Sequence, residues 1–263
     1  MKNLLFIPCY RCAPQITRVL QGIKDDLQYF DEIIVIDNIS PDETALTAKR
    51  FIQDHNIPKT KVLINPANVG LGGSHKLAFL YAIQEKFDHV VILHGDDQGS
   101  LKDFRPILES MKVTRLNCFW MGARFHPRSI LNGYSTFRIL GNLFYNGIAC
   151  ILTTRTIHDL GGSGVNLFPV HLIRAHSFLT YANDLTFHVY LLLNSIKMGQ
   201  PLNFRPISWR EDDQISNVKL IAQSVKLLKI LFHFFRDQKL LEEQSQSFDY
   251  TPAHWLNPEI EIA

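Results

Sequence analysis

Short apolar segments alternate with segments of helical spacing through the first part of the chain. The apolar segments are rich in β-branched residues and read NLLFIP (3–8), EIIVID (32–37), KVLIN (61–65) and HVVILHG (89–95). The segments of helical spacing are 14–23, a stretch that begins near Asp42, and 70–87. Continuous apolar strands of this kind are buried on both faces of a sheet, and strand–helix alternation favours parallel strands with right-handed crossovers. The sequence therefore predicts an α/β fold with a Rossmann-like, mostly parallel sheet flanked by helices.

Composition narrows the class of protein further. The chain has 263 residues, 46% of them hydrophobic, and a formal net charge of +2. This length suits one large domain with a sizeable core, and a low charge without a long Lys/Arg block argues against nucleic-acid binding. Four cysteines are too few for a disulfide scaffold, so we expect a reducing, cytoplasmic compartment. Cys9 and Cys12 form a CxxC pair that suits a redox pair or half a zinc site, but no second CxxC or histidine pair at ligand spacing follows.

Polar residues follow each apolar segment at its carboxyl end. They are Pro8, Cys9, Tyr10 and Arg11 after the first, Asp37, Asn38 and Ser40 after the second, NPANVGLGGSHKLAF (65–79) after the third and HGDDQGS (94–100) after the fourth. Each piece alone fits ordinary loop chemistry, with Ser40 capping the helix that begins near Asp42 and NVGLGG forming a flexible turn. Ligands of parallel sheets bind beyond the carboxyl ends of the strands. The four pieces together therefore favour one ligand site at this edge.

Five of these stretches also resemble a known family. In order, IPCYR, VIDNISPDET, NPANVGLGGSHKLAF, LHGDDQGS and GARF resemble the family 2 glycosyltransferases of the GT-A (nucleotide-diphospho-sugar transferase) fold. Within that family they look most like the polyprenyl-phosphate, dolichyl-phosphate mannose synthase-like sugar transferases. The resemblance is good over about 3–125 and weaker to about 218, where RTIHDLGGSGVNLF and RPISWREDDQISNVK match. Single motifs are unspecific, whereas five in order at the family's spacing are specific.

The resemblance implies a domain division and a bound metal ion. Residues 1–217 would form the glycosyltransferase domain, with a nucleotide-sugar-binding half (1–125) and an acceptor half (126–217), followed by a C-terminal amphipathic helix and tail (218–263). Asp96 and Gln98 match ligands of Mg²⁺ or Mn²⁺, which would neutralise the leaving diphosphate, and Asp97 is a helper. His94 stands where the family has its first acid and is the third candidate metal ligand. An imidazole can ligate Mn²⁺ or hydrogen-bond a ribose, but it suits Mg²⁺ poorly. The alternatives that His94 only caps the strand, and that the protein is a degenerate homologue, stay open.

The nucleotide is expected to contact residues at the other strand ends. Asp37 matches the first acid of the nucleotide loop, and Asn38 replaces the second with a group that also donates hydrogen bonds. Pro8 and Tyr10 would flank the base, with a buried core position as the alternative for Tyr10. The glycines of the third segment, among them Gly70 and Gly72, would let the backbone approach phosphate at a helix N-terminus.

Residues of the second half are matched to the acceptor and to catalysis. Asp159 is the expected general base and Asp184 its competitor, although either could simply cap a helix. An acceptor that is already an anionic phosphate needs no base. Arg124 and Arg210 match arginines near the donor diphosphate or the acceptor phosphate, where guanidinium forks suit the task.

The stretch 217–236 predicts an amphipathic helix. A narrow polar stripe lies on one side of it and consists of Lys219, Gln223, Lys226, Lys229, His233 and Arg236. The broad apolar remainder would pack on the sheet or a second subunit, or lie in a membrane interface where basic side chains meet anionic lipid. No uncharged run reaches the roughly 18 residues of a membrane-spanning helix, and MKNLLFIPCYR is too short for a signal peptide.

The sequence thus predicts a metal-dependent, inverting glycosyltransferase. Its donor would be a nucleotide-diphosphate sugar, and its acceptor would be a polyprenyl phosphate or a cell-surface glycan of envelope polysaccharide biosynthesis. We expect the protein in the cytoplasm. Residues 217–236 would contact the inner face of the membrane peripherally or would form the interface of a homodimer. One alternative is a non-catalytic nucleotide-sugar-binding homologue. The other is a nucleotidyltransferase, which would carry a glycine-rich, basic loop after its first strand that IPCYRCAP lacks.

Overall fold

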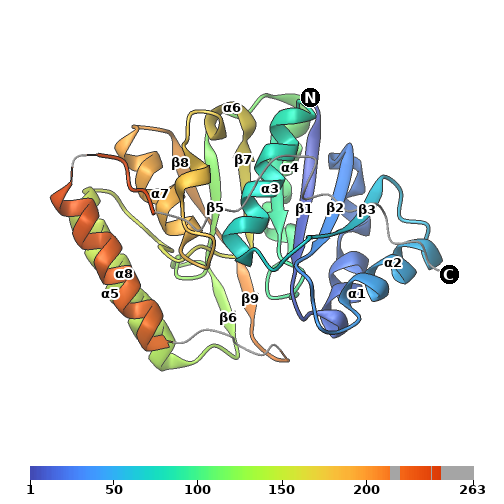
Figure 1. Ribbon diagram of the computed structural model, residues 1–263, viewed down its shortest axis with the longest axis horizontal. Helices are drawn as coiled ribbons and strands as arrows, with labels where there is room; N and C mark the ends of the chain where they lie inside the picture. The colour runs from blue at the N-terminus through green and yellow to red at the C-terminus, as the bar shows by residue number, and fades with distance from the viewer. Residues whose placement is uncertain (214–219, 238, 244–263) are drawn as a thin grey trace.

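The computed structural model describes residues 1–213, 220–237 and 239–243 of the chain. Its central sheet contains β1 Asn3–Cys9, β2 Glu32–Asp37, β3 Thr60–Ile64, β4 His89–Leu93, β5 Phe119–Ala123, β7 Val165–Pro169 and β8 Leu202–Pro206. The strand order is β3-β2-β1-β4-β7-β5-β8 (Figure 1). A separate two-stranded ribbon pairs β6 (Ile130–Asn132) with β9 (Ser208–Arg210) in parallel.

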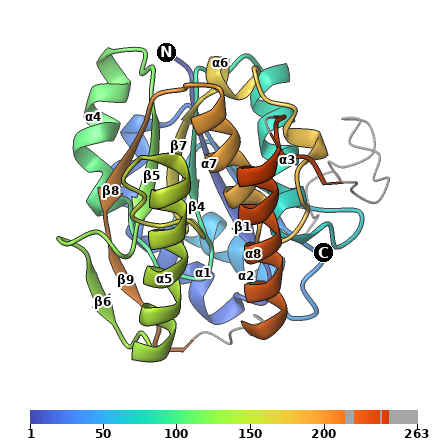
Figure 2. The same cartoon turned by 90° about the vertical axis from the view of Figure 1, so that its left-hand side faces the viewer.

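Helices connect the strands and cover both faces of the sheet (Figures 1 and 2). The α-helices are α1 Ala13–Gly22, α2 Thr44–Asp54, α3 Gly70–Gln84, α4 Arg105–Val113, α5 Thr136–Thr153, α6 Val170–Ile173, α7 Phe187–Lys197 and α8 Leu220–Arg236. Three short 3₁₀ helices are η1 Lys24–Tyr29, η2 Leu101–Phe104 and η3 Phe178–Thr180.

The apolar side chains of β1 alternate between two cores. Leu4 and Phe6 pack in a core with α3 and α7, whereas Leu5 and Ile7 pack in a second core with α1 and α4. Every residue of β1 and β4 is buried, and β3, β2, β1 and β4 pair in parallel. The predicted parallel sheet buried on both faces is therefore confirmed in this half of the molecule.

Strand β7 runs against its neighbours. It pairs antiparallel with β4, with Leu93 opposite Val165, and antiparallel with β5. The start of β7 therefore lies beside the carboxyl end of β4, and His94 N–H donates to the Gly164 carbonyl at 2.8 Å. The sheet is mostly parallel, as expected, and its one reversed strand brings the loop 161–164 to the edge where the polar strand ends meet.

Helix α2 begins differently from the prediction. It starts at Thr44, whose hydroxyl donates to the Asp42 carboxylate at 2.6 Å. The hydroxyl of Ser40 instead donates to the Asp37 carboxylate. The prediction that Ser40 caps this helix is wrong, because Ser40 lies too far from the first turn and contacts the strand end behind it.

Helix α3 begins in tight contact with the backbone of residues 182–184. An added Cβ at Gly72 would lie 2.3 Å from the Ala182 carbonyl oxygen, and one at Gly70 would lie 2.3 Å from that of Asn183. Gly70 also has a φ of 72°, which non-glycine residues rarely adopt. These glycines bring α3 close to the segment that leads into α7.

Lys76 fastens the next turn of α3 to the same region. Its ammonium group donates to the carbonyl oxygens of Leu179 and Tyr181, at 3.0 and 2.5 Å, and to the Asn183 side chain at 2.6 Å. Burial lowers the pKa of Lys76 to about 8. The dipoles of these acceptors make the burial of the charged group tolerable.

Helices α5 and α8 lie side by side at the end of the molecule opposite β3 (Figures 1 and 2). Ile230, Leu231 and Phe234 of α8 are buried against the core. Large apolar side chains remain exposed on both helices, and we call them the α5–α8 apolar surface: Phe137, Leu140, Leu143, Phe144 and Ile151 on α5, with Val225, Leu228, Phe232 and Phe235 on α8. The expected amphipathic helix is therefore present, with part of its apolar side packed and part exposed.

In the described part of the chain, no helix is both long and apolar enough to span a membrane. The predicted boundary at 217 and Lys219 lie outside the described residues. Halves 1–125 and 126–217 share one sheet, because β7 inserts between β4 and β5. The domain division stays a prediction.

The contact between α3 and residues 182–184 generates a stability prediction. Gly72→Ala should lower the free energy of unfolding by about 1–3 kcal/mol, because the methyl group overlaps backbone that cannot move aside freely. Gly147→Ala, on an exposed face of α5 with nothing within 4 Å of the added Cβ, should raise it by about 0.5–1 kcal/mol. Urea denaturation measures both changes. Equal effects of the two substitutions would contradict the described contact.

Candidate active site

The carboxyl ends of β1, β2 and β4 meet at one place. Cys9 lies opposite Asp37 in the pairing of β1 with β2, and Gly95 N–H donates to the Pro8 carbonyl at 3.0 Å. Burial and the Cys12 thiol raise the pKa of Cys9 well above its ordinary value, and the carboxylates of Asp37 and Asp96 add to this effect. Both acids therefore lie near the Cys9 thiol. The structure brings together the first, second and fourth of the predicted strand ends.

Asp37 is buried and held by one short loop. Its carboxylate accepts a hydrogen bond from Ser40 N–H at 3.0 Å and another from the Ser40 hydroxyl. Burial raises the pKa of Asp37, whereas the two bonds from Ser40 lower it, and the net direction is upward. The side chain thus lies at the predicted position for a nucleotide contact, next to a hydroxyl that fixes its orientation.

Asn38 connects the end of β2 to the loop before α3. Its carbonyl oxygen accepts from Asn65 at 2.9 Å and from Val69 N–H at 3.0 Å, and its amide group donates to Asn68 at 2.8 Å. This network uses both ends of the Asn38 amide within the protein. Asn38 therefore positions the loop 65–69, and a predicted direct contact with the nucleotide would compete with these bonds.

Pro8 and Tyr10 differ in exposure. Pro8 is buried within β1, whereas Tyr10 is 38% exposed and the Arg11 guanidinium lies 5.4 Å from its ring centroid. The alternative of a buried core tyrosine is therefore wrong. Tyr10 presents an aromatic face at the strand end, as base stacking requires.

Asp96 and Gln98 follow β4 in a tight turn. The Asp96 carboxylate accepts from Gln98 N–H at 3.2 Å. Burial raises the pKa of Asp96 to about 6, and the neighbouring Asp97 carboxylate adds to this. Asp97 has a φ of 59°, which turns the chain sharply between the two predicted metal ligands.

Two arginines converge on Asp97. Its carboxylate accepts from Arg18 Nε at 2.6 Å and from the Arg210 guanidinium, and its carbonyl accepts from Arg210 Nε at 2.9 Å. Arg18 is 41% exposed and Arg210 is 38% exposed. The predicted Arg210 therefore lies beside the acids after β4, together with Arg18, whose place in α1 gave no sign of a site in the sequence.

Arg124 and Asp159 form a buried ion pair. Arg124 Nε and Nη2 each donate to a different oxygen of the Asp159 carboxylate at 2.8 Å, and Arg124 N–H donates at 2.9 Å. The side chains are 11% and 0% exposed. Burial lowers the pKa of Arg124, but the Asp159 carboxylate raises it further, so the guanidinium stays charged. Because its carboxylate is enclosed, Asp159 is placed to orient Arg124 and the loop 161–164, and this geometry gives no support to its predicted role as general base.

The Asp184 side chain is more exposed than that of Asp159, but its carboxylate also has hydrogen-bond partners within the protein. Its carboxylate accepts from the Thr186 hydroxyl at 2.6 Å and from Lys226 Nζ at 2.8 Å. Burial raises the pKa of Asp184, but the bonds from Lys226 and Thr186 outweigh it, and the net direction is downward. A carboxylate with a lowered pKa is a weak general base. The oxygen that accepts from the Thr186 hydroxyl also accepts from Thr186 N–H at 2.8 Å, so Asp184 holds the turn just before α7, whose N-cap position is Thr186.

Gly70 and Gly72 permit a close backbone approach within the protein. That approach is made by the carbonyl groups of residues 182 and 183. The expected close approach is therefore present, and the predicted contact of these glycines with phosphate stays a prediction.

His94 lies among two other histidines that the sequence analysis missed. His75, His94 and His188 form the one group of three or more His, Cys, Asp or Glu ligand atoms found among the described residues. They come from α3, from the turn after β4 and from α7, so no local spacing reveals them. The CxxC pair, by contrast, is buried as two free thiols and gathers no further ligand in the part of the chain described.

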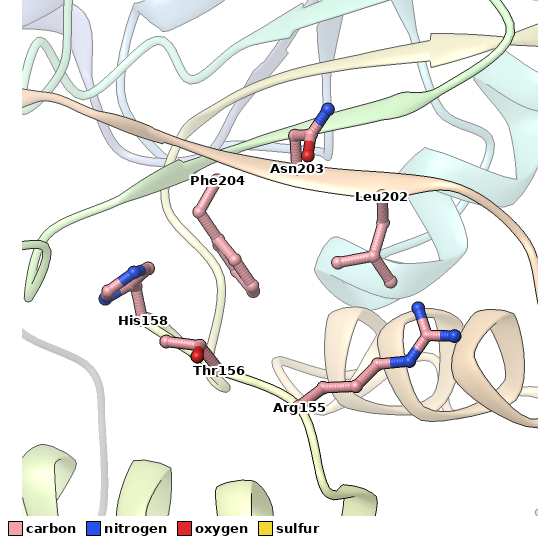
Figure 3. A pocket seen from close by; sticks show the side chains of 6 residues that line it. All are labelled: Arg155, Thr156, His158, Leu202, Asn203 and Phe204. Carbon is pink, nitrogen blue, oxygen red and sulfur yellow. The ribbon is translucent and has the colours of Figure 1, made fainter.

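A hollow of about 470 Å³ lies elsewhere, beside β8 (Figure 3). Its lining consists of Arg155, Thr156, His158, Leu202, Asn203 and Phe204. None of the predicted site residues belongs to it. The convergence of acids and arginines at the strand ends, rather than this hollow, marks the candidate active site.

Comparison with known proteins identifies the family. Residues 5–162 match the family described as Glycosyl transferase family 2. A dolichyl-phosphate beta-glucosyltransferase of Dictyostelium discoideum is 24% identical over 211 residues, which cover 78% of this chain and 63% of that protein. The chain thus spans less than two thirds of the length of this relative.

Solved structures of glucosyl-3-phosphoglycerate synthase from Mycobacterium tuberculosis have a similar fold. The complex with Mn²⁺, uridine-diphosphate and phosphoglyceric acid has a TM-score of 0.68 at 14% identity, covering 89% of this chain and 78% of that one. The complex with Mn²⁺, UDP-glucose and glycerol 3-phosphate has a TM-score of 0.65 at 14% identity, covering 88% and 79%. The expected GT-A fold is confirmed.

The buried Arg124–Asp159 pair yields a prediction about stability. Asp159→Asn should lower the free energy of unfolding by about 3–5 kcal/mol, because it leaves a buried guanidinium without its anionic partner. Asp213→Asn is the matched control, since its pair with Arg18 is 43% and 41% exposed and should change stability by at most about 1 kcal/mol. Chemical denaturation at neutral pH compares them. A stable Asp159→Asn variant that has lost turnover alone would restore the role of general base.

Proposed function

The chain belongs to glycosyl transferase family 2, and we propose that it transfers a sugar from a nucleotide-diphosphate sugar to the phosphate of a polyprenyl phosphate. One observation carries the donor half of this proposal. Asp37, Asp96 and the arginines around Asp97 converge at the ends of three neighbouring strands, where sheets of this class bind ligands. The similar solved structures contain UDP or UDP-glucose, so uridine-diphosphate sugars are the first donors to test.

Mg²⁺ or Mn²⁺ fits the residues after β4. Asp96 supplies a carboxylate and Gln98 an amide oxygen, and both ions accept oxygen ligands of this kind. Burial raises the pKa of Asp96 to about 6, and a cation beside a buried carboxylate favours its charged form. When bound, the ion would supply Lewis-acid stabilisation of the departing diphosphate. His94 is left out of this set, because its Nε2 is buried next to the other two histidines.

Sugar transfer to a phosphate acceptor needs little from the protein beyond position and charge. An anionic phosphate oxygen attacks the anomeric carbon, the bond from that carbon to the diphosphate breaks, and the nucleoside diphosphate leaves with the electron pair. A single displacement of this kind inverts the anomeric centre. No proton has to be removed from the acceptor, which agrees with the enclosed Asp159 and the lowered pKa of Asp184.

Arg18 and Arg210 are the groups we assign to the phosphates. Both reach the same carboxylate, Asp97, and both remain more than a third exposed. Guanidinium groups bind phosphate oxygens in a forked geometry, so a diphosphate can take up part of their hydrogen-bonding capacity. Arg124 is assigned a positioning role, since Asp159 and the rings of Phe125 and Trp209 enclose it.

The lipid half of the proposal is supported by the α5–α8 apolar surface. Large exposed apolar side chains gathered on one surface mark a place that meets a partner or a lipid phase. The relative from Dictyostelium discoideum is described as acting on dolichyl phosphate, which is a membrane lipid. Lys229, His233 and Arg236 are exposed on α8 and would meet anionic lipid headgroups. We therefore place the membrane, rather than a second copy of the chain, against this surface.

Lys226, a member of the predicted basic stripe, is paired with acids of the protein. Its ammonium group lies 2.8 Å from the Asp184 carboxylate and 2.9 Å from that of Glu243. These two acids hold it against the protein. Of the predicted stripe lysines, Lys229 is therefore the one we assign to lipid.

The two alternative functions, a nucleotidyltransferase and a non-catalytic nucleotide-sugar-binding homologue, differ in the support they retain. Membership of the family removes the basis for a nucleotidyltransferase. A non-catalytic nucleotide-sugar-binding homologue keeps one supporting observation, the histidine at position 94 where the family has an acid. That rival binds the donor as tightly as an enzyme would but transfers no sugar.

Donor binding provides the direct test of the metal assignment. In calorimetric titrations with UDP, added Mn²⁺ should tighten binding, and Asp96→Ala should abolish this metal-dependent gain because a central carboxylate ligand is lost. Asp25→Ala, an exposed acid of η1, should behave as the wild type. Mn²⁺-dependent binding of undiminished strength in Asp96→Ala would refute the assignment.

The α5–α8 apolar surface is tested with vesicles containing anionic lipid. Phe144→Glu combined with Phe232→Glu should weaken sedimentation with these vesicles more than tenfold, since burying a phenylalanine contributes about 1.5–3 kcal/mol. Val113→Glu, which changes an exposed apolar residue of α4 outside this surface, should have little effect. Lys229→Glu should reduce binding less, and added salt should mimic it. A wild-type protein that ignores vesicles but forms a dimer dissociated by the double substitution would identify a second copy as the partner.

A further inference from the structure

Three histidines meet between α3, β4 and α7. His75 and His188 are buried, His94 is half-buried, and one ring nitrogen from each lies within 4.8 Å of the others. The Nε2 atoms of His75 and His188 are 3.2 Å apart. The rings of His94 and His188 also lie 5.8 and 4.7 Å from that of His75, both edge-on. Nothing in the proposed sugar transfer requires this cluster.

The orientation of His75 is fixed from outside the cluster. Its Nδ1 lies 2.8 Å from the Leu71 carbonyl oxygen, and a carbonyl can only accept, so Nδ1 carries the proton and donates. The lone pair of His75 is therefore on Nε2, which faces His188. Histidines that bind metals are commonly held this way, with the second nitrogen donating to a backbone carbonyl.

Two further nitrogens of the cluster lack a hydrogen-bond partner among the described residues. These atoms are His94 Nε2 and His188 Nδ1, and both are buried. Buried polar atoms without partners are uncommon in native proteins, and a site for an ion or a water molecule is one cause. A group bound between the rings would give His94 Nε2 the partner that the protein does not supply.

Glycines make room for two of the rings. An added Cβ at Gly164 would lie 3.0 Å from the His94 ring, and one at Gly162 would lie 2.9 Å from that of His188. The loop 161–164 thus packs directly on the cluster. Any larger residue at these positions would push the rings out of their present arrangement.

Burial favours the neutral form of the two buried rings. It lowers the pKa of His75 to about 3 and that of His188 well below its ordinary value, and a neighbouring ring of the cluster adds to the effect in both cases. Neutral imidazole is the form that binds metal ions.

We propose that His75, His94 and His188 bind one transition-metal cation, with Zn²⁺ as the ion that best fits three imidazole ligands. Two nitrogens bound to zinc at tetrahedral angles lie about 3.3 Å apart, close to the 3.2 Å between His75 and His188. The widest separation in the group, up to 4.8 Å, requires one ring to move by roughly 1–1.5 Å on binding. His94 is the ring placed to move, since it is the least buried.

This site differs in kind from the one assigned to Mg²⁺ or Mn²⁺. Imidazole selects borderline cations such as zinc, whereas carboxylate and amide oxygens select hard ones. Three-histidine zinc sites leave a fourth position for water or an oxygen ligand. The ion would also join α3, the turn after β4 and α7, next to the loop 161–164 and the turn of Asp96. The proposal stands apart from sugar transfer, and its test needs no turnover.

Cobalt titration of the tag-free, chelator-treated full chain tests the proposal. Co²⁺ should bind at one equivalent with the intense visible absorption of a tetrahedral site, and Zn²⁺ should displace it. His94→Gln and His188→Gln should each weaken binding by more than the roughly 10–100-fold that losing an outer-shell partner costs. His94 is the least buried of the three, and circular dichroism checks that each variant is folded.

Two controls separate this site from others on the molecule. The double variant His126→Gln, His158→Gln removes a surface pair whose ring centroids lie 4.5 Å apart and should leave the cobalt spectrum unchanged. Asp96→Ala should also keep it. The proposal is overturned if Co²⁺ binds without stoichiometry, if His94→Gln and His188→Gln bind it as the wild type does, or if Asp96→Ala alone abolishes the spectrum.

Discussion

Antiparallel pairing of β7 with β4 brings distant parts of the chain to one edge of the sheet. Leu93 lies opposite Val165, so the turn that carries Asp96 and the loop 161–164 leave the sheet together. The hydrogen bond from His94 N–H to Gly164 extends this pairing by one step. The candidate metal ligands, the Arg124–Asp159 pair and the three histidines all depend on that register. A shift of β7 by one residue would turn its side chains to the opposite faces and separate these groups.

Several charged side chains are buried around this edge, and a different feature offsets the cost of burying each one. Arg124 has Asp159 in bidentate contact, and Lys76 has backbone carbonyls. Asp96 has a raised pKa because burial disfavours its charge. Pairs of this kind contribute less to stability than to geometry, because desolvation offsets much of their attraction. Burial makes the Asp96 carboxylate costly to ionise, and in the proposed function a divalent cation beside it would offset that cost.

The fold and the sheet edge that carries the candidate site follow from the sequence, whereas the partners of individual side chains do not. Continuous apolar strands and polar strand ends identify the sheet edge, because those signals are local. Gly70 and Gly72 predicted a close backbone approach, but only the tertiary structure shows that the backbone of residues 182 and 183 is what approaches them. Asp159 matched an acidic position, yet its burial against Arg124 depends on β5 and the loop before β7. His75 and His188 are far apart in the chain and sit in apolar helices, so no spacing reveals their meeting with His94.

Transfer itself is the most direct measurement. Purified full-length protein would be incubated with radiolabelled UDP-glucose, Mn²⁺ and a short-chain polyprenyl phosphate, with other nucleotide sugars tested in parallel. A family 2 enzyme of the proposed kind moves label into the organic phase, bound to the lipid through a new sugar–phosphate bond, and releases the nucleoside diphosphate in equal amount. Tight, Mn²⁺-dependent binding of the donor without label in any lipid or glycan acceptor would contradict the proposed transfer and identify a non-catalytic homologue.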